Sequence, residues 1–396
     1  QPPDGNHLEE SGGDGGMKWE TYKLKQLCSE IVDCVNKTAP TSDVPTPYKM
    51  LRTSDIREGK INLENLNCVT KEVYEKWTRR GKLQKGDVIF TREAPLGEVG
   101  LVREEKNYFL GQRLVLFRAN NKMCDGRFLM YSLLWHDNKQ AIISKGVGST
   151  VAHLRVPECE NIEIKVPDLD VQHRIADILS AYDDLIENNQ KQIKLLEEAA
   201  QRLYKEWFVD LRFPGYENTK IVDGVPEGWR RGLLKELISV NYGKDHKKAP
   251  DDGNIPVYGS GGLMRKCNKS LFSGEAVLIP RKGSLNNIMY VDETFWTVDT
   301  MFYATMKQPH TAVFVYFFVK AFDMYSMNIG AAVPSMTAKI LDAMDVVIPD
   351  KETLEKFDKC AKTYFNKIKT LQGQNERLKT ARNLLLPKLM SGEVEV

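Results

Sequence analysis

The sequence predicts an α+β protein: two related globular domains with a mainly β core, separated by two long antiparallel coiled-coil helices about a pseudo-twofold axis. Two observations support this fold class. Motifs recur at a constant interval along the 396 residues, and two stretches keep an apolar 4–3 spacing for more than four heptads. The interval far exceeds the roughly 20–50 residues of solenoid units, so it indicates a duplicated domain.

The duplication is defined by matched anchors in the two halves. At one constant offset in residue number, Gly148-Ser149-Thr150-Val151 and Val166-Pro167-Asp168 match Gly330-Ala331-Ala332-Val333 and Ile348-Pro349-Asp350. At a second constant offset, Trp19, Leu24 and Leu27 match Trp229, Leu234 and Leu237. Residues 85–92 also resemble residues 273–281, which pairs Arg92 with Arg281. Two related domains on one chain suit the recognition of two targets at a fixed separation.

The anchors and the Pro/Gly punctuation divide the chain into five parts. We expect a disordered leader or cloning remnant at 1–16, a first domain at 17–165, a long helix at 166–212, a linker and second domain at 213–348, and a distal helix and tail at 349–396. Short β-type runs are expected at residues 87–90, 113–117, 276–279 and 301–304, and short helical segments at 128–135 and 314–322.

The two long helices carry a continuous apolar seam with one asparagine each. The first seam comprises Ile175, Leu179, Tyr182, Ile186, Asn189, Ile193, Leu196, Ala200, Leu203 and Trp207. The second comprises Phe357, Ala361, Tyr364, Ile368, Leu371, Asn375, Leu378, Arg382, Leu385 and Leu389. About 33 helical residues would make a spacer of roughly 50 Å. Pro387 is expected to disturb the last turn of the second helix.

The asparagines predict the direction in which the helices pair. Antiparallel packing with Asn189 opposite Asn375 makes the seam ends coincide and places Ala200 opposite the larger Tyr364. Parallel packing would bury both amides opposite aliphatic side chains, which costs the hydrogen bonds of those amides. The antiparallel arrangement is therefore expected, with one globular domain at each end of the helices.

Composition and motifs exclude several classes of protein. No apolar run reaches the roughly 18 residues of a membrane span. Seven scattered cysteines without Cys-x-x-Cys argue against a zinc site and indicate a reducing cytoplasm. Neither a nucleotide-binding P-loop nor an Asn/Asp-Pro-Pro-Tyr/Phe methyltransferase tetrad is present, so no catalytic residue and no metal ligand is predicted. The net charge of +2 is low for a DNA-binding protein.

The loops of both halves nevertheless resemble DNA-facing surfaces, because they combine cations and amides with small residues that let the backbone approach phosphates. Candidates in the first half are Arg52, Thr53, Arg92, Gln112, Arg113, Ser149 and Thr150. Candidates in the second half are Tyr242, Lys244, Lys247, Tyr258, Ser260, Arg281, Lys282, Ser284 and Asn286. Each loop taken singly suits ordinary solvated surface, whereas recurrence at matched positions favours DNA contact for the set.

With these features together, the chain resembles the specificity subunit of a Type I restriction–modification system over residues 17–396. The segments that carry the resemblance are Gln172-His173-Arg174-Ile175-Ala176-Asp177-Ile178-Leu179, Leu203-Tyr204-Lys205-Glu206-Trp207-Phe208-Val209-Asp210, Leu384-Leu385-Leu386-Pro387-Lys388-Leu389-Met390-Ser391-Gly392-Glu393, Pro45-Thr46-Pro47-Tyr48-Lys49-Met50 and Arg281-Lys282-Gly283-Ser284.

The resemblance implies a function and a set of partners. The globular halves would be target recognition domains, each reading one half of a bipartite, asymmetric site in double-stranded DNA. The helices would set the unread spacer and dock two modification subunits, which are adenine-N6 methyltransferases that bind S-adenosylmethionine. Up to two restriction subunits, which use ATP and Mg²⁺, would join this core. The chain itself would bind no cofactor and would not be an enzyme. Two alternatives stay open: a coiled-coil scaffold without DNA readout, and the recognition part of a fused methyltransferase or nuclease.

Overall fold

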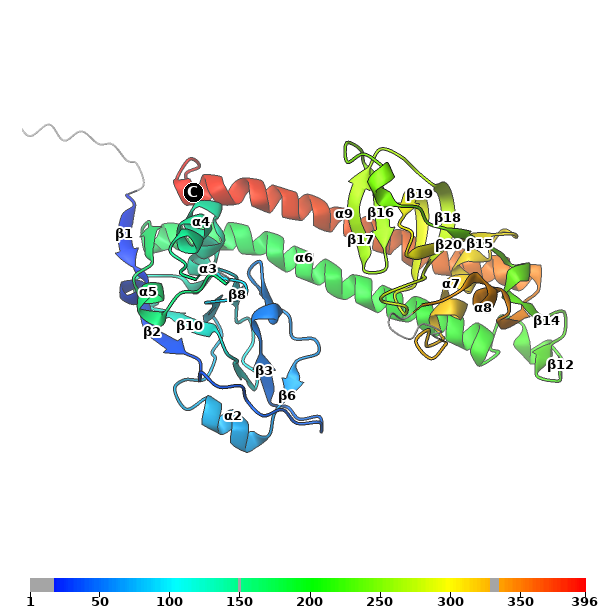
Figure 1. The fold of residues 1–396 in the computed structure, drawn as a ribbon, viewed down its shortest axis with the longest axis horizontal. Coiled ribbons are helices and arrows are strands. Elements are labelled where there is room, and N and C mark those ends of the chain that lie inside the picture. Colours follow the sequence, from blue (N-terminus) through cyan, green and yellow to red (C-terminus); the bar gives the residue numbers. More distant parts are fainter. Residues whose placement is uncertain (1–17, 149–150, 328–334) are drawn as a thin grey trace, which may run out of the picture. The chain divides into compact units, whose positions relative to one another are not determined.

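The long helices α6 (Leu169–Tyr204) and α9 (Lys351–Ser391) organise the fold (Figure 1). The computed structural model describes residues 18–148, 151–327 and 335–396, in two units. The first unit contains the described residues of 1–188 and 375–396, and the second contains those of 189–374. Each long helix therefore contributes one part to each unit. The expected leader at 1–16 lies outside the described residues, as do Ser149 and Thr150.

The first unit contains a four-stranded antiparallel sheet in the order β2-β10-β7-β8. Its strands are β1 (Glu20–Lys23), β2 (Cys28–Asp33), β3 (Lys49–Leu51), β4 (Ile56–Arg57), β5 (Lys60–Ile61), β6 (Asn67–Cys68), β7 (Val88–Thr91), β8 (Val99–Leu101), β9 (Tyr108–Leu110), β10 (Leu114–Ala119) and β11 (Glu163–Val166). Its short helices are α1 (Leu24–Leu27), η1 (Thr53–Asp55), α2 (Lys71–Trp77), α3 (Gly126–Leu134), α4 (His136–Ser144) and α5 (Val156–Glu160).

The second unit contains a six-stranded sheet in the order β15-β20-β18-β19-β16-β17. Its strands are β12 (Ile221–Val222), β13 (Val225–Pro226), β14 (Arg230–Leu233), β15 (Ile238–Tyr242), β16 (Ile255–Gly259), β17 (Gly262–Cys267), β18 (Phe272–Pro280), β19 (Met289–Thr297), β20 (Met301–Met306) and β21 (Asp345–Ile348). Its other helical segments are η2 (Lys205–Val209), η3 (Tyr216–Asn218), η4 (Leu234–Glu236), η5 (His246–Lys248), α7 (Ala312–Lys320) and α8 (Ala338–Asp342).

The duplication is visible in backbone pairing at the base of each unit. Strand β1 pairs antiparallel with β11, and β14 pairs antiparallel with β21 in the same register. The residue that follows β1 and the residue that follows β14 form equivalent hydrogen bonds. Leu24 N donates to Ile162 O, and Leu234 N donates to Met344 O, both at 2.9 Å. Ile162 and Met344 are related by the first of the two offsets read from the sequence, and Leu24 and Leu234 by the second. The two units are therefore copies of one topology, in which β2, β10, β7 and β8 correspond to β15, β20, β18 and β19.

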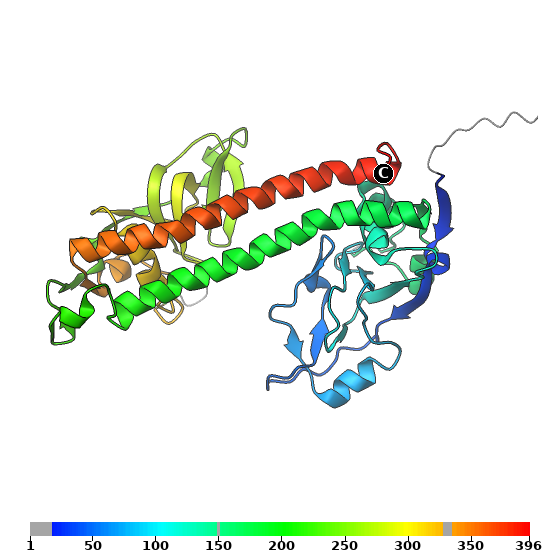
Figure 2. The same ribbon diagram turned by 180° about the vertical axis from the view of Figure 1, so that it is seen from behind.

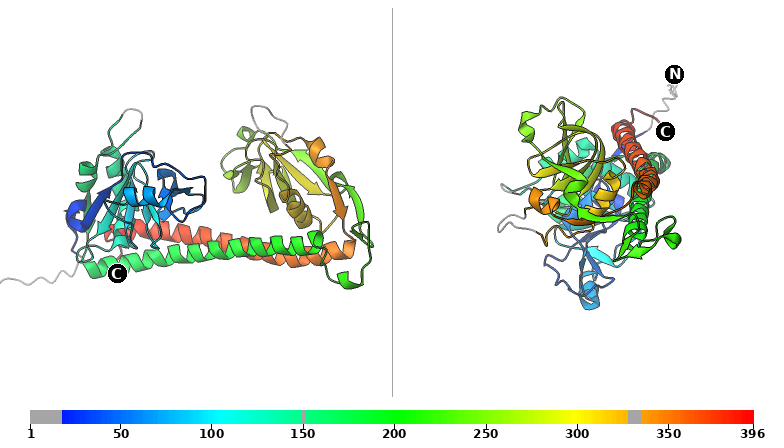
Figure 3. Two further views of the ribbon diagram at one scale, coloured as in Figure 1. Left: turned by 90° about the horizontal axis from the view of Figure 1, so that it is seen from below. Right: turned by 90° about the vertical axis from the view of Figure 1, so that its right-hand side faces the viewer.

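Within each unit the two long helices run side by side and antiparallel (Figure 2). In the first unit Leu389 lies in one apolar core with Ile175, and Arg382 forms an ion pair with Asp183. In the second unit the ring of Phe357 contacts Trp207, with 5.8 Å between centroids. Later residues of α6 therefore lie beside earlier residues of α9, as expected for an antiparallel pair. The globular part of each unit covers one side of its helix pair (Figure 3).

The apolar seam explains why these helices are stable as a pair. Every predicted seam position is buried or half-buried, including Asn189 and Asn375. The pairing of these two asparagines stays a prediction, since they belong to different units. An apolar stripe of this width must be covered to offset the entropy of ordering the helix.

The start of α9 is capped, and its end differs from the sequence-based expectation. The helix begins at Lys351, well before the first seam residue, because Asp350 accepts a hydrogen bond from Thr353 N at 3.0 Å and caps it. Burial disfavours the charged form of Asp350, but hydrogen bonds from Thr353 and Trp229 outweigh this and hold its pKa below the ordinary value. The expectation that Pro387 disturbs the last turn is wrong, because α9 continues to Ser391. Asn383 and Pro387 are exposed, so water can satisfy the carbonyl that the proline leaves unpaired.

The antiparallel register of the first unit gives a direct prediction. Cysteines placed at Ile186 and Leu378 should form a disulfide readily under mild oxidation, because the neighbouring Asp183–Arg382 pair holds the helices in this register. A pair at Ile186 and Ile368, which parallel packing would bring together, should not crosslink. Non-reducing electrophoresis, in a background with the exposed Cys360 replaced by serine, measures both. Efficient crosslinking of the second pair alone would contradict the register.

Candidate DNA interface

The matched arginines Arg92 and Arg281 occupy equivalent places, directly after β7 and β18. Arg92 N donates to Arg113 O at 2.8 Å, and Arg281 N donates to Thr300 O at 2.8 Å. Each arginine carbonyl then accepts from a returning segment: Leu154 N at 3.0 Å in the first unit and Met336 N at 2.9 Å in the second. Leu154 and Met336 are related by the same offset as Ile162 and Met344, so the equivalence predicted for the two arginines is confirmed.

The two guanidinium groups have different surroundings. Arg92 is 17% exposed, pairs with Asp33 at 3.3 Å and donates to Leu154 O at 3.2 Å, so it joins three segments of the first unit. Arg281 lies 5.6 Å from the ring of Tyr242 and donates to the backbone oxygen of Asp299 at 3.2 Å. Among the described residues Arg281 forms no ion pair. Equivalent backbone positions therefore hold one arginine that is paired with a carboxylate and one whose charge is balanced by no carboxylate among the described residues.

The end of β15 and the segment after it present three candidate residues on a backbone held by hydrogen bonds. Lys244 N donates to Thr297 O at 2.9 Å, and Lys244 O accepts from the indole of Trp296 at 3.0 Å. Gly243 is required there, since a Cβ would lie 2.0 Å from Val298 O. Tyr242, Lys244 and Lys247 are exposed. A loop held by backbone hydrogen bonds, with two exposed lysines and an exposed aromatic ring, suits contact with phosphates and bases.

The remaining candidates of the second unit fall into two groups. Lys282 and Ser284 are exposed next to Arg281. Asn286 donates to Asp323 at 3.0 Å and accepts from Met324 N at 2.8 Å, so its amide stabilises the loop. Tyr258 donates to Glu293 at 2.5 Å, and burial together with this hydrogen bond raises its pKa, which keeps the hydroxyl protonated. Ser260 is half-buried, and its carbonyl accepts from Asn287 at 2.9 Å.

The described candidates of the first unit lie at the ends of strands from two neighbouring sheets. Gly111 N donates to Leu51 O at 2.9 Å, which brings Arg52 and Thr53 next to Gln112 and Arg113. The side chains are mostly engaged: Arg52 with the buried Asp55 at 2.8 Å, Gln112 with Thr38 at 3.1 Å, and Arg113 with Glu93 at 3.3 Å. The structure thus gathers these residues, but it leaves fewer free cations here than in the second unit.

Three exposed residues of the second unit were not predicted. Tyr325 donates to Gly283 O at 3.2 Å, which places its ring beside the Arg281–Ser284 loop. Leu263 and Met264 form the exposed tip of the β16–β17 hairpin. The Gly-Gly turn between two β-type runs is the signal that could have identified this hairpin.

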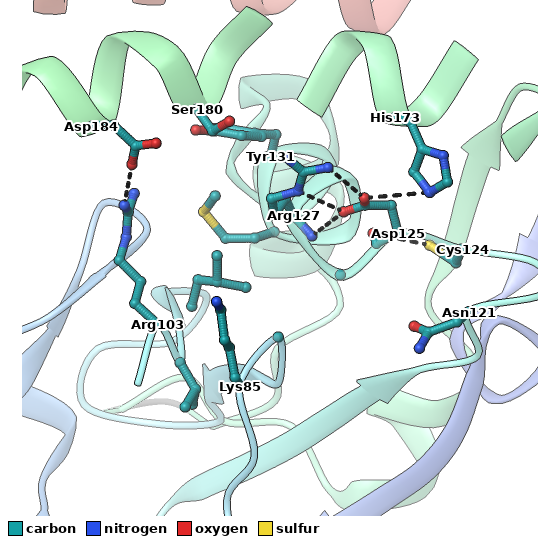
Figure 4. Close-up of a pocket in the computed structure, with 15 residues that line it drawn as sticks. Lys85, Arg103, Asn121, Cys124, Asp125, Arg127, Tyr131, His173, Ser180 and Asp184 are labelled. Carbon is teal, nitrogen blue, oxygen red and sulfur yellow. Dashed lines mark hydrogen bonds and ion pairs between the residues drawn. The ribbon is translucent and has the colours of Figure 1, made fainter. Parts of the chain in front are cut away.

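A cavity of about 640 Å³ lies in the first unit between the globular part and α6 (Figure 4). Its arginines are already paired: Arg127 bridges Asp125 at 2.9 Å and Asp177 at 2.6 Å, and Arg103 pairs with Asp184. Figure 4 shows the Arg103–Asp184 pair linking the domain to the helix. We interpret the cavity as space left between the globular part and α6 where these ion pairs connect them. Its lining residues are Lys85, Gly86, Leu101, Val102, Arg103, Asn121, Cys124, Asp125, Gly126, Arg127, Met130, Tyr131, His173, Ser180 and Asp184.

The second unit joins its domain to α9 through groups of both signs. Lys362 of the helix pairs with Glu275 of β18 at 2.9 Å, and Lys369 donates to the backbone oxygen of Asp292 at 2.9 Å. The helix also supplies the buried carboxylate of Asp358, which lies 2.8 Å from His310 Nδ1. In the first unit α6 supplies the carboxylates Asp177 and Asp184.

No group of three metal-ligating side chains occurs among the described residues. In the part of the chain that the structure describes, no helix is both long and apolar enough to cross a membrane.

Comparison with known proteins identifies the family. The family model described as Type I restriction modification DNA specificity domain matches residues 17–198 and again residues 226–380, one match for each copy of the duplication. The chain belongs to this family. It is thus a Type I specificity subunit, and such subunits are the non-catalytic components of restriction–modification systems. This family assignment confirms the prediction that the chain is not an enzyme.

Similar proteins cover 79–96% of the chain. The MjaIX specificity subunit of Methanocaldococcus jannaschii is 25% identical over 358 residues, which cover 79% of this chain and 78% of that protein. The HindI specificity subunit of Haemophilus influenzae is 21% identical over 476 residues, covering 95% and 99%. The crystal structure of the S subunit from M. genitalium matches with a TM-score of 0.60 at 18% identity, over 96% of this chain and 98% of that one. The last match confirms the predicted fold class.

Proposed function

We propose that the chain recognises a bipartite, asymmetric DNA site, with each globular domain reading one half. The observation that carries this proposal is the contrast between Arg92 and Arg281. The same backbone position holds a side chain paired with a carboxylate in one copy, and in the other a guanidinium beside Tyr242 that forms no ion pair among the described residues. Two copies of one scaffold with different loop chemistry are suited to read different bases. Arg52, Gln112 and Arg113 are the counterpart residues that we assign to the first half-site.

We also propose that the paired helices set the spacer and dock two adenine-N6 methyltransferase subunits. Supporting this, Leu185, Leu195 and Leu384 are more than half exposed on the helices, outside the seam. Exposed leucines on an otherwise polar helix face suit a protein partner. Up to two restriction subunits would complete the complex. S-adenosylmethionine, ATP and Mg²⁺ would be bound by these partners. All seven cysteines are free, which suits action in the reducing cytoplasm.

The experiment that tests this function is an exchange of one recognition domain. Replacing residues 17–165 by the same region of a relative should change one half-site and leave the other half-site and the spacer unchanged. Mapping methylated adenines in a host that carries the hybrid measures all three together. Exchange of residues 213–348 is the matched control and should change the opposite half-site. If the sequences of both half-sites changed in either hybrid, the two domains would not recognise their half-sites independently, and the proposal would be contradicted.

Arg281 provides the corresponding prediction for a single residue. If its guanidinium reads a base edge, Arg281→Ala should cost about 1–3 kcal/mol in binding and relax discrimination at one position of one half-site. The rigid strand β18 that ends beside it favours this outcome. If Arg281 contacts a phosphate instead, the substitution should weaken binding to all DNA sequences equally. It should also reduce the slope of log K against log salt concentration by about one unit. Competitive binding at several salt concentrations measures both effects. Arg231→Ala, which removes a bond to the backbone of Asp223 away from this edge, is the control and should bind normally.

A further inference from the structure

The β16–β17 hairpin carries exposed apolar side chains at its tip. Leu263 is 59% exposed and Met264 is 53% exposed. A Cβ built on Gly261 or Gly262 would meet no atom within 4 Å, so the turn projects away from the unit. The hairpin forms the edge of the six-stranded sheet (Figure 1). Neither Leu263 nor Met264 belongs to an apolar core of the unit.

The hairpin is held firmly although its tip is free. Asn287 donates to Ser260 O at 2.9 Å, which ties the turn to the loop that begins at Arg281. On β17 itself, Arg265 donates to Ala249 O at 2.7 Å and pairs with Asp251. The tip therefore presents its apolar side chains at a defined place beside the candidate DNA interface.

The charge around the hairpin indicates which kind of partner covers the tip. Residues 241–287 contain eight Lys or Arg and four Asp or Glu, a local charge of +4, whereas the whole chain carries +2. Lys244, Lys266 and Lys282 of this region are exposed. A rigid apolar tip within a cationic surface fits a polyanion with an apolar interior, and stacked base pairs flanked by phosphates have this character.

We propose that the hairpin tip is a wedge that inserts Leu263 and Met264 between base pairs from the minor groove when the second unit binds DNA. This inference rests on the proposed function. Leucine and methionine are among the side chains that partly unstack base steps and kink the duplex. The wedge adds sequence preference without hydrogen bonds to bases, because pyrimidine–purine steps open more easily than others. Steps at or beside the second half-site are thereby selected by their flexibility.

The test uses the full chain assembled with its modification subunits and DNA that carries the mapped site. A fluorescent base analogue that brightens on unstacking is placed at successive positions across the second half-site and its flanks. The wild-type protein should increase the fluorescence of the analogue at one base step. The double variant Leu263→Ala/Met264→Ala should abolish that signal and weaken binding by about tenfold. Any base flipped for methylation gives a separate signal that the double variant retains. Ile221→Ala, an equally exposed apolar residue on β12, should leave both readouts unchanged.

Three outcomes would overturn the wedge, and each differs from failure of the proposed function. Wild-type protein that binds without brightening any step outside the flipped bases contradicts insertion while leaving DNA recognition intact. A double variant that keeps the step signal shows that other residues cause it. A double variant that no longer assembles with the modification subunits, seen by size-exclusion chromatography, shows that the tip is a protein contact. Failure of the wild-type complex to distinguish target from random DNA would instead contradict the proposed function.

Discussion

Replacing Asp183 by alanine is expected to lower the free energy of unfolding of the first unit by about 3–5 kcal/mol. The side chains of Asp183 and Arg382 are 6% and 12% exposed, and they form the ion pair that joins α6 to α9. Asp183 also accepts a hydrogen bond from Tyr131 of α3 at 2.6 Å. Its loss would leave a buried guanidinium and a buried hydroxyl without their carboxylate. Urea unfolding followed by circular dichroism measures the change.

Two variants serve as controls for Asp183. Asp184→Ala removes the neighbouring carboxylate, which is 62% exposed and pairs with Arg103 at the surface, and should change stability by no more than about 1 kcal/mol. Asp183→Ala combined with Arg382→Leu removes both charges and should recover most of the loss, because a buried pair is costly chiefly when one partner is left alone. A single variant as stable as the wild type would show that the pair does not hold the helices together.

Replacing Phe357 by alanine should destabilise the second unit by a similar amount, about 3–5 kcal/mol. Phe357 is fully buried where the first turns of α9 meet the end of α6. Its ring lies 4.8 Å from that of Phe208 and 5.8 Å from that of Trp207. The side chain has no polar atom, so the cost comes from lost burial and from the cavity that remains. Unfolding followed by tryptophan fluorescence measures it.

Phe357→Leu is the matched variant, and it should cost less than about half as much because leucine fills most of the space. Equal losses for leucine and alanine would indicate that the edge-to-face contacts of the ring, rather than its volume, stabilise this site. A loss below about 1 kcal/mol for alanine would contradict the view that Phe357 anchors the helix pair.

Local pattern was enough to predict several elements. The 4–3 spacing predicts both long helices and the residues of their seam, because a helix turns by a constant angle per residue and its apolar face must be covered. The matched segments of the two halves predict that Arg92 and Arg281 are equivalent, and their backbone bonds confirm it. Pro387 shows the limit of local pattern, since an exposed helix end tolerates a proline that a buried one would not.

The duplication, the antiparallel helices and the family could be predicted from the amino-acid sequence, because each depends on residues at regular spacing or on matched segments. The loop side chains that are paired within the fold could be identified only once the strands were placed in three dimensions. Arg92 is neutralised by Asp33, which reaches it from β2 across the sheet, whereas Arg281 meets the ring of Tyr242. The exposed tip at Leu263 and Met264 is likewise a property of the folded edge. Side-chain availability depends on which strands become neighbours, and such long-range pairing has no local signature.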